Sequence, residues 1–189
     1  MSETGVNWNV GSMVLRAIPL LVILSLLELG SGFVLESLRE SFLSYHSLLV
    51  LVPSVIGLAG NMGSVLSSKI STGLHLGTID FSDSVFDEKV VSESLGVVMI
   101  ALSLSLVMGV FSYIFGTLSG NPLPFIKVVS VSVVSSFLLS IFVIFLSVLV
   151  VYTAYRRGAD PDDVAIPVVT NLSDIVGILV FAGTVLLIV

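Results

Sequence analysis

Asp174 is the foremost of several oxygen-bearing side chains that lie within otherwise apolar stretches of this sequence. It lies about ten residues into the last such stretch, or roughly 16 Å along a helix that rises about 1.5 Å per residue. That depth is close to the middle of a bilayer, where a carboxylate costs on the order of 3 kcal/mol and must face protein, water or a cation. Asp174 therefore either binds a cation or is protonated and hydrogen-bonded between helices.

The neighbours of Asp174 favour the cation. Thr170 and Asn171 lie four and three positions before Asp174, so the three side chains share one helical face. Gly177, three positions after it, leaves a gap on that face. Pro167 either frees a main-chain carbonyl or marks the first turn of the helix. The pattern indicates a polar cavity along this face.

A second group of candidate ligands lies in the apolar stretch 46–68. Three glycines surround an asparagine there: Gly57, Gly60, Asn61 and Gly63. The glycines are compatible with close packing of helices, the commonest role of membrane glycines, and equally with a bend that exposes carbonyl oxygens. Asn61 favours the second interpretation, because amide and carbonyl oxygens are the hard ligands that Mg²⁺ prefers.

The remaining polar side chains at membrane depth are assigned different roles. Glu28, inside the first apolar stretch, is a candidate for a polar path, with a buried pairing as the alternative, while Glu36 marks the interface. His46 and His75 have no carboxylate three or four positions away, so no zinc site is predicted. The serines of the fourth stretch are assigned to helix packing; they are Ser130, Ser132, Ser135, Ser136 and Ser140.

Composition identifies lipid as the main solvent of the elements that carry these residues. Of 189 residues, 56% are hydrophobic and only 11% are charged, and the mean hydropathy is +1.16. Backbone polar groups in hydrocarbon need internal partners, and the apolar stretches exceed the roughly 10 residues of a membrane β-strand, so helices are favoured over a barrel. The predicted fold class is all-α, a polytopic transmembrane helical bundle that forms one integral membrane domain over residues 1–189.

Five stretches are long and apolar enough to span a bilayer. They are residues 17–36, 46–68, 95–118, 125–153 and 164–189. The basic residues favour a cytoplasmic N-terminus, which places five of the seven on that side; these are Arg16, Lys69, Lys89, Arg156 and Arg157. The acidic segment 78–93 is predicted to be an aqueous loop, and the expected location is the cytoplasmic membrane, with several passes.

Several functional classes are disfavoured. The net charge of −6 argues against nucleic-acid binding, and the lack of cysteine excludes disulfides and iron–sulfur clusters. The chain contains no phosphate-binding loop, nucleophile elbow or zinc-protease motif, so neither a cofactor nor an enzymatic activity is predicted. An intramembrane enzyme would need a second carboxylate at the depth of Asp174, which only Glu28 could supply.

Two motifs resemble the MgtE family of magnesium channels and transporters, and especially its eukaryotic magnesium solute-carrier branch. The first runs from Pro53 through the glycines and Asn61 to Thr72, and the second runs from Asp162 through Pro167 to Asp174. The resemblance covers essentially the whole chain. It implies a five-helix unit that pairs with a second copy around a pore, in which Asp174 is the principal cation ligand.

The resemblance also implies the transported ion, Mg²⁺ first, with Mn²⁺ or Co²⁺ as other candidates. The predicted ligand set is Asp174, Asn61, Thr170, Asn171, Gly60 and Glu28, and the predicted assembly is a homodimer in lipid. Channel members carry a long N-terminal regulatory region, whereas residues 1–15 alone precede the first span here, so no regulatory domain is expected. The alternative is a structural or assembly subunit in which Asp174 pairs with a basic residue of a partner.

Overall fold

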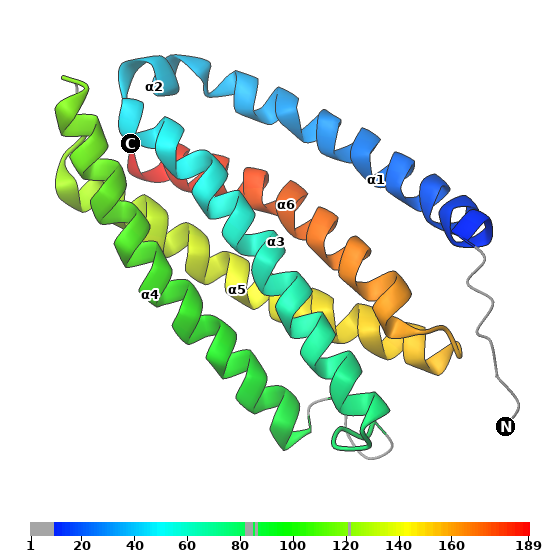
Figure 1. Ribbon diagram of the computed structural model, residues 1–189. Helices are drawn as coiled ribbons and strands as arrows, with labels where there is room; N and C mark the ends of the chain where they lie inside the picture. Colours follow the sequence, from blue (N-terminus) through cyan, green and yellow to red (C-terminus); the bar gives the residue numbers. More distant parts are fainter. Residues whose placement is uncertain (1–9, 82–84, 86, 121) are drawn as a thin grey trace, which may run out of the picture.

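Over the described residues, the computed structural model of the chain is a bundle of six α-helices (Figure 1). The structure describes residues 10–81, 85, 87–120 and 122–189, and for residues 10–17 and 20 only the course of the backbone. The helices are α1 (Val10–Ser37), α2 (Arg39–Ser44), α3 (His46–His75), α4 (Glu88–Leu118), α5 (Phe125–Arg156) and α6 (Pro161–Ile188). The long helices alternate in direction, so their connections lie at the two ends of the bundle.

Four of the described helices, α3 to α6, are both long and apolar enough to cross a membrane. They coincide with the predicted spans 46–68, 95–118, 125–153 and 164–189. The remaining predicted span, 17–36, falls within α1, whose 28 residues extend over about 42 Å and so exceed the roughly 30 Å of bilayer hydrocarbon. The prediction of an all-α polytopic bundle is confirmed.

The acidic segment 78–93 is only partly a loop, which corrects the prediction. Helix α4 already begins at Glu88, whose backbone N–H donates to Asp87 Oδ1 over 2.7 Å. This side-chain cap satisfies one of the free donors at the helix start, and water solvates the charged first turns beyond the membrane. Of the predicted polar segments, residues 1–9 and Asp83 lie outside the described residues.

Helix α3 is the central helix of the bundle and packs against α4, α5 and α6. Small side chains allow close approach to α4, since a Cβ atom at Gly116 would lie 2.9 Å from Ser47 Cβ. One turn away, Ser112 Oγ donates a hydrogen bond to the carbonyl oxygen of Ser47. In lipid, where burial of apolar side chains gives helices little reason to associate, such packing and hydrogen bonding hold them together.

The serines of α5 contribute to the same packing, as predicted. Ser132 Oγ donates to the Ser105 carbonyl oxygen on α4 over 2.7 Å, and the Ser135 and Thr184 hydroxyls join α5 to α6 over 2.5 Å. Ser140 Oγ instead donates to a carbonyl of its own helix. These serines therefore serve helix association and backbone hydrogen bonding.

Helix α1 lies on the outside of the bundle (Figure 1) and, among the described helices, contacts only α6 and α2. Most of its described side chains are exposed, including the large apolar side chains of Leu26, Leu29 and Phe33. In a bilayer these side chains are solvated by acyl chains. The one buried face of α1 is thus directed at α6, the helix that carries Asp174.

The alternating helices predict the sidedness of two exposed residues, Ser119 after α4 and Ala159 before α6. Because α5 separates them, Ser119 should face the outside and Ala159 the cytoplasm when the N-terminus is cytoplasmic. The chain contains no cysteine, so single cysteines can be labelled specifically. We expect a membrane-impermeant maleimide to label Ser119→Cys in intact cells and Ala159→Cys only after permeabilisation. The reverse pattern would invert the orientation, and labelling of both in intact cells would show that α5 does not cross.

Candidate cation site in the membrane

Asp174 and Gly60 meet at the midpoints of two packed helices. Asp174 lies 13 residues after the start of α6 and 14 before its end, and Gly60 lies 14 residues after the start of α3 and 15 before its end. The contact is therefore roughly 20 Å from either end of both helices, at a rise of about 1.5 Å per residue. Because α6 begins at Pro161, Asp174 lies a few ångströms further along its helix than the roughly 16 Å predicted, but still at its middle.

The absence of a side chain at Gly60 is what lets the Asp174 carboxylate approach α3. A Cβ atom built at Gly60 would overlap Asp174 Oδ1 and would lie 3.1 Å from Cγ and 3.2 Å from Oδ2. One turn further on, a Cβ at Gly63 would lie 2.7 Å from Val169 Cγ1 and 3.2 Å from Ser173 Oγ. Of the two roles left open for the three glycines, close packing is confirmed for Gly60 and Gly63. At Gly60 the packed group is the carboxylate itself.

Three of the buried polar atoms that lack a partner among the described residues lie within two turns of α6, and five others are spread over α3 and α5. Among the described residues, Asp174 Oδ1, Thr170 Oγ1 and Ser173 Oγ are all buried and make no hydrogen bond. Asp174 and Thr170 are four positions apart and share one helical face, as predicted. A buried polar atom that lacks a partner costs free energy, on the order of 1–3 kcal/mol and more when charged. These oxygens are therefore available to a ligand.

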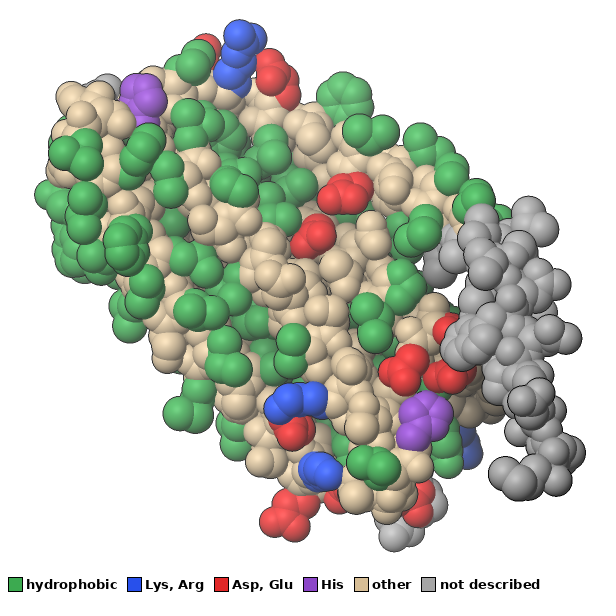
Figure 2. All heavy atoms as spheres, viewed as in Figure 1, with side chains coloured by type: hydrophobic (Ala, Val, Ile, Leu, Met, Phe, Trp, Pro, Cys, Tyr) green, Lys and Arg blue, Asp and Glu red, His purple; other side chains and the backbone are tan. Residues whose placement is uncertain are grey.

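Glu28 of α1 adds a second carboxylate to this region. It is exposed, and it is close enough to Asp174 for the two carboxylates to repel each other. Figure 2 shows acidic side chains in the middle of one face of the molecule, away from the charged residues at the ends of the bundle. The structure thus brings together Asp174, Gly60, Thr170 and Glu28 from three helices.

Basic side chains do not neutralise either carboxylate. Among the described residues, the ion pairs of Lys and Arg are Arg39 with Glu36 and Lys69 with Glu93, and the Arg39 pair supports the interfacial role predicted for Glu36. Within the described chain, no Lys or Arg forms an ion pair with Asp174 or Glu28. An excess of negative charge at membrane depth favours a bound cation.

Asn61 lies on a different surface from the carboxylate. It is exposed on α3 together with Gly57, which lies four positions earlier on the same face. A Cβ at Gly57 would meet nothing within 4 Å, so this glycine is not needed for packing within one chain. Helix α3 runs unbroken through the glycines, so the predicted bend with exposed carbonyls is wrong. Glycine lowers helix propensity by only about 1 kcal/mol, so packing can keep such a helix continuous.

Asn171 has one half of its amide occupied. Its Nδ2 donates to the Pro167 carbonyl oxygen over 2.9 Å, which leaves the amide oxygen as a possible ligand. Pro167 lies inside α6, which begins at Pro161, so it does not mark the first turn. Because its ring nitrogen has no hydrogen, Pro167 leaves the carbonyl of Asp163 without its usual helical donor.

A cluster that sequence spacing did not predict lies at the ends of these helices. His75, the last residue of α3, lies beside Asp160 and Asp162 at the start of α6. His75 lies 85 and 87 residues before the two aspartates, so a search at intervals of three or four positions could not find the cluster. From the sequence, this contact could be inferred only from the topology, because α3 ends on the side of the membrane where α6 begins.

Comparison with known proteins identifies relatives over most of the chain. Residues 52–184 match the profile of the MgtE family, described as divalent cation transporters. The chain is 30% identical to solute carrier family 41 member 3 of Rattus norvegicus over 172 residues, which is 88% of this chain and 37% of the relative. It is 26% identical to solute carrier family 41 member 2 of Xenopus laevis over 179 residues, 90% of this chain and 32% of the relative. The chain thus spans about a third of the length of these relatives.

The contact between Gly60 and Asp174 predicts a large difference between two glycine substitutions. Gly60→Ala introduces a methyl group that overlaps the carboxylate, and we expect it to destabilise the protein by about 1–3 kcal/mol, the usual cost of overpacking. Gly57→Ala, in open space on the same helix, is the matched control and should change stability little. Thermal unfolding of the purified protein in detergent measures both.

The double variant Gly60→Ala with Asp174→Ala tests the cause of this destabilisation. Removing the carboxylate relieves the overlap, so the two changes should be strongly non-additive. Equal effects of the two glycine substitutions, or additivity in the double variant, would mean that the close approach is not what Gly60 provides.

Proposed function

Since the chain belongs to the MgtE family of divalent cation transporters, we propose that it carries divalent cations, Mg²⁺ foremost, across the cytoplasmic membrane. The observation that carries this proposal is the Asp174 carboxylate, which lies at mid-helix with a buried oxygen that has no partner among the described residues. In hydrocarbon such an oxygen is costly unless a cation compensates it.

Electrostatics around Asp174 support a divalent ion over a neutral ligand. Two carboxylates, Asp174 and Glu28, repel each other, and no described Lys or Arg forms an ion pair with either. One divalent ion near both would replace their repulsion by attraction and would balance two negative charges. The oxygen-only character of the site suits Mg²⁺, which takes carboxylate oxygens and keeps several of its waters; Mn²⁺ and Co²⁺ are further candidates.

In this proposal one charged residue binds the ion and neutral residues bind its water molecules. Asp174 is the principal ligand. Thr170 Oγ1, four positions away with a free buried oxygen, and the amide oxygen of Asn171 hold water molecules of the hydrated ion. Glu28, exposed on the loosely packed α1, raises the local concentration of cations at the site.

Two copies of the chain complete the path in this proposal. Gly57 and Asn61 form an exposed polar surface on α3 that no helix of the described chain covers, one turn from the Gly60 contact. An exposed amide at membrane depth is unfavourable against lipid. A twofold homodimer places the same surface on both sides of its axis, so the two Asp174 side chains and two Asn61 side chains would flank one pore.

The alternative function, that of a structural or assembly subunit, gives Asp174 a different binding partner. It requires a basic or polar partner residue that pairs with this carboxylate. The described chain supplies no such basic residue, so the partner would have to be another protein. Substitution of Asp174 by the neutral, isosteric asparagine separates the two functions.

Uptake of Mg²⁺ into proteoliposomes that contain the full chain tests the proposal. We expect Asp174→Asn to lower the uptake rate at least about tenfold, the equivalent of about 1.4 kcal/mol, because the charge that attracts the ion is lost. Asp163→Asn, which removes an exposed charge from the first turn of the same helix, is the matched control and should leave uptake unchanged.

The oligomeric state of both variants is measured alongside uptake. Lost uptake with an unchanged assembly supports transport through Asp174. Folded wild-type protein that gives no uptake above empty liposomes, or an Asp174→Asn variant that transports normally, would refute the proposal. Loss of a partner protein from the purified complex on Asp174→Asn would favour the assembly role.

Glu28→Gln should weaken cation capture without abolishing transport. The side chain is exposed and acts on the site through its charge alone, so its removal should cost about 1 kcal/mol of attraction, or about a fivefold rise in the KM for Mg²⁺. The maximal rate should change little. Uptake measured over a range of Mg²⁺ concentrations, at low and at high ionic strength, shows the effect, which salt should diminish. An unchanged KM would place Glu28 outside the ion path.

A further inference from the structure

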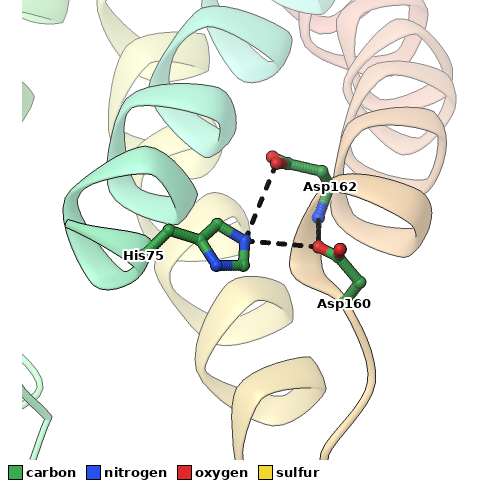
Figure 3. A group of neighbouring side chains, drawn as sticks. All are labelled: His75, Asp160 and Asp162. Atoms are coloured by element: carbon green, nitrogen blue, oxygen red, sulfur yellow. Dashed lines mark hydrogen bonds and ion pairs between the residues drawn. The ribbon is translucent and has the colours of Figure 1, made fainter. Parts of the chain in front are cut away.

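A second group of metal-ligating side chains lies at the end of the bundle where α3 ends and α6 begins. His75 Nε2 lies 3.4 Å from Asp160 Oδ1 and 3.8 Å from Asp162 Oδ2. Figure 3 shows the imidazole of α3 directed at the two carboxylates, which come from the first residues of α6 and the residue before it. One ligand atom from each of the three residues lies within 4.8 Å of the other two.

The spacing of these atoms suits a shared metal ion better than direct hydrogen bonds. Charge-assisted N–H···O bonds are about 2.7–2.9 Å long, shorter than both contacts of His75. A tetrahedral ion with Zn–N and Zn–O bonds of about 2.0–2.2 Å sets its donor atoms about 3.3–3.6 Å apart. The separation between His75 Nε2 and Asp160 Oδ1 falls in that interval, and a small rotation of the exposed Asp162 side chain would bring its oxygen to the same distance.

The surroundings leave room for an ion beside the three side chains. All three side chains are about half exposed, so water can fill the remaining coordination positions. A hollow of about 350 Å³ opens beside His75 and Asp160, and Tyr155 at the end of α5 forms another of its walls. The carboxyl end of α3, whose last carbonyls carry partial negative charge, also adjoins the cluster.

The donor set selects a class of ion. Imidazole nitrogen combined with carboxylate oxygen suits first-row transition metals such as Zn²⁺ and Co²⁺, whereas Mg²⁺ takes oxygen ligands and water almost exclusively. We propose that His75, Asp160 and Asp162 form a divalent transition-metal site on the membrane surface. Asp162 lies 12 residues before Asp174, about 18 Å along α6, so this site is separate from the one at mid-membrane.

An ion at this position joins two helices that share no other described ion pair. It would link the end of α3 to the start of α6, the two helices whose midpoints form the contact between Gly60 and Asp174. A ligand that binds only the folded state raises the apparent stability of the protein by mass action. Zn²⁺ should therefore raise the unfolding temperature of the purified chain.

Metal binding is measured on the full chain in detergent, in an Asp174→Asn background that removes the mid-membrane carboxylate. Calorimetric titration with Zn²⁺ and the visible absorption of bound Co²⁺ report affinity and coordination directly. We expect one ion per chain, a Co²⁺ spectrum typical of four-coordinate geometry, and no displacement by a hundredfold excess of Mg²⁺. Neither readout depends on transport, so the result stands apart from the uptake experiment.

His75→Gln and Asp162→Asn should each weaken Zn²⁺ binding at least tenfold, because each removes one of three protein ligands. Asp162 is chosen over Asp160, whose carboxylate also caps α6 by accepting a hydrogen bond from the Asp162 backbone N–H. Asp163→Asn is the matched control: it removes a neighbouring exposed charge outside the cluster and should leave binding unchanged.

Three outcomes would overturn the proposal. The first is that the folded Asp174→Asn protein binds no Zn²⁺. The second is that Zn²⁺ binding persists in His75→Gln. The third is that Mg²⁺ displaces bound Co²⁺ at concentrations as low as those at which Zn²⁺ does. In the first case the cluster is a set of side-chain contacts between the ends of α3 and α6 without a metal. Circular dichroism of each variant verifies that it has kept its helices.

Discussion

A carboxylate at the midpoint of a membrane helix has to be compensated, and the packing around Asp174 follows from this constraint. Lipid hydrocarbon cannot solvate a charge at that depth, so the carboxylate needs a cation, water, a hydrogen-bond donor or a proton. The bundle brings the carboxylate against the backbone of α3 at Gly60 and near a second carboxylate, Glu28, on α1. Neither neighbour neutralises it. The arrangement concentrates negative charge and oxygens without hydrogen-bond partners in one place, as the proposed path for divalent cations requires.

The same contact explains how the central helix is built. Helix α3 packs against α4, α5 and α6 at once, and small residues lie at its contacts with α4 and α6. Towards α6 these are Gly60 and Gly63, while towards α4 the small side chain of Ser47 accommodates Gly116. Glycine lowers helix propensity by about 1 kcal/mol relative to alanine, and lipid adds no hydrophobic drive for association. The helix nevertheless continues unbroken from His46 to His75, since packing on three sides holds it.

Hydropathy predicted most of the fold, because hydrocarbon admits few alternatives. The four spans of α3 to α6 and the depth of Asp174 all follow from helix rise and apolar length. The partnership of Asp174 with Gly60 could not be predicted at residue level, since it depends on the rotation of two helices about their axes. The same rotation leaves Asn61 exposed rather than beside the carboxylate. His75 and its two carboxylates escaped prediction for a different reason: their contact depends on which helix ends meet, and local spacing carries no information about that.

The central claim is that Asp174 binds a divalent cation, and locating that ion tests it most directly. The full chain in lipid, with Mn²⁺ in place of Mg²⁺, can be crystallised and the metal located by its anomalous scattering. The account predicts an anomalous peak within one water layer of the Asp174 carboxylate, between two copies of the chain. A structure in which Asp174 instead forms an ion pair with a basic side chain, with no metal peak beside it, would contradict the account.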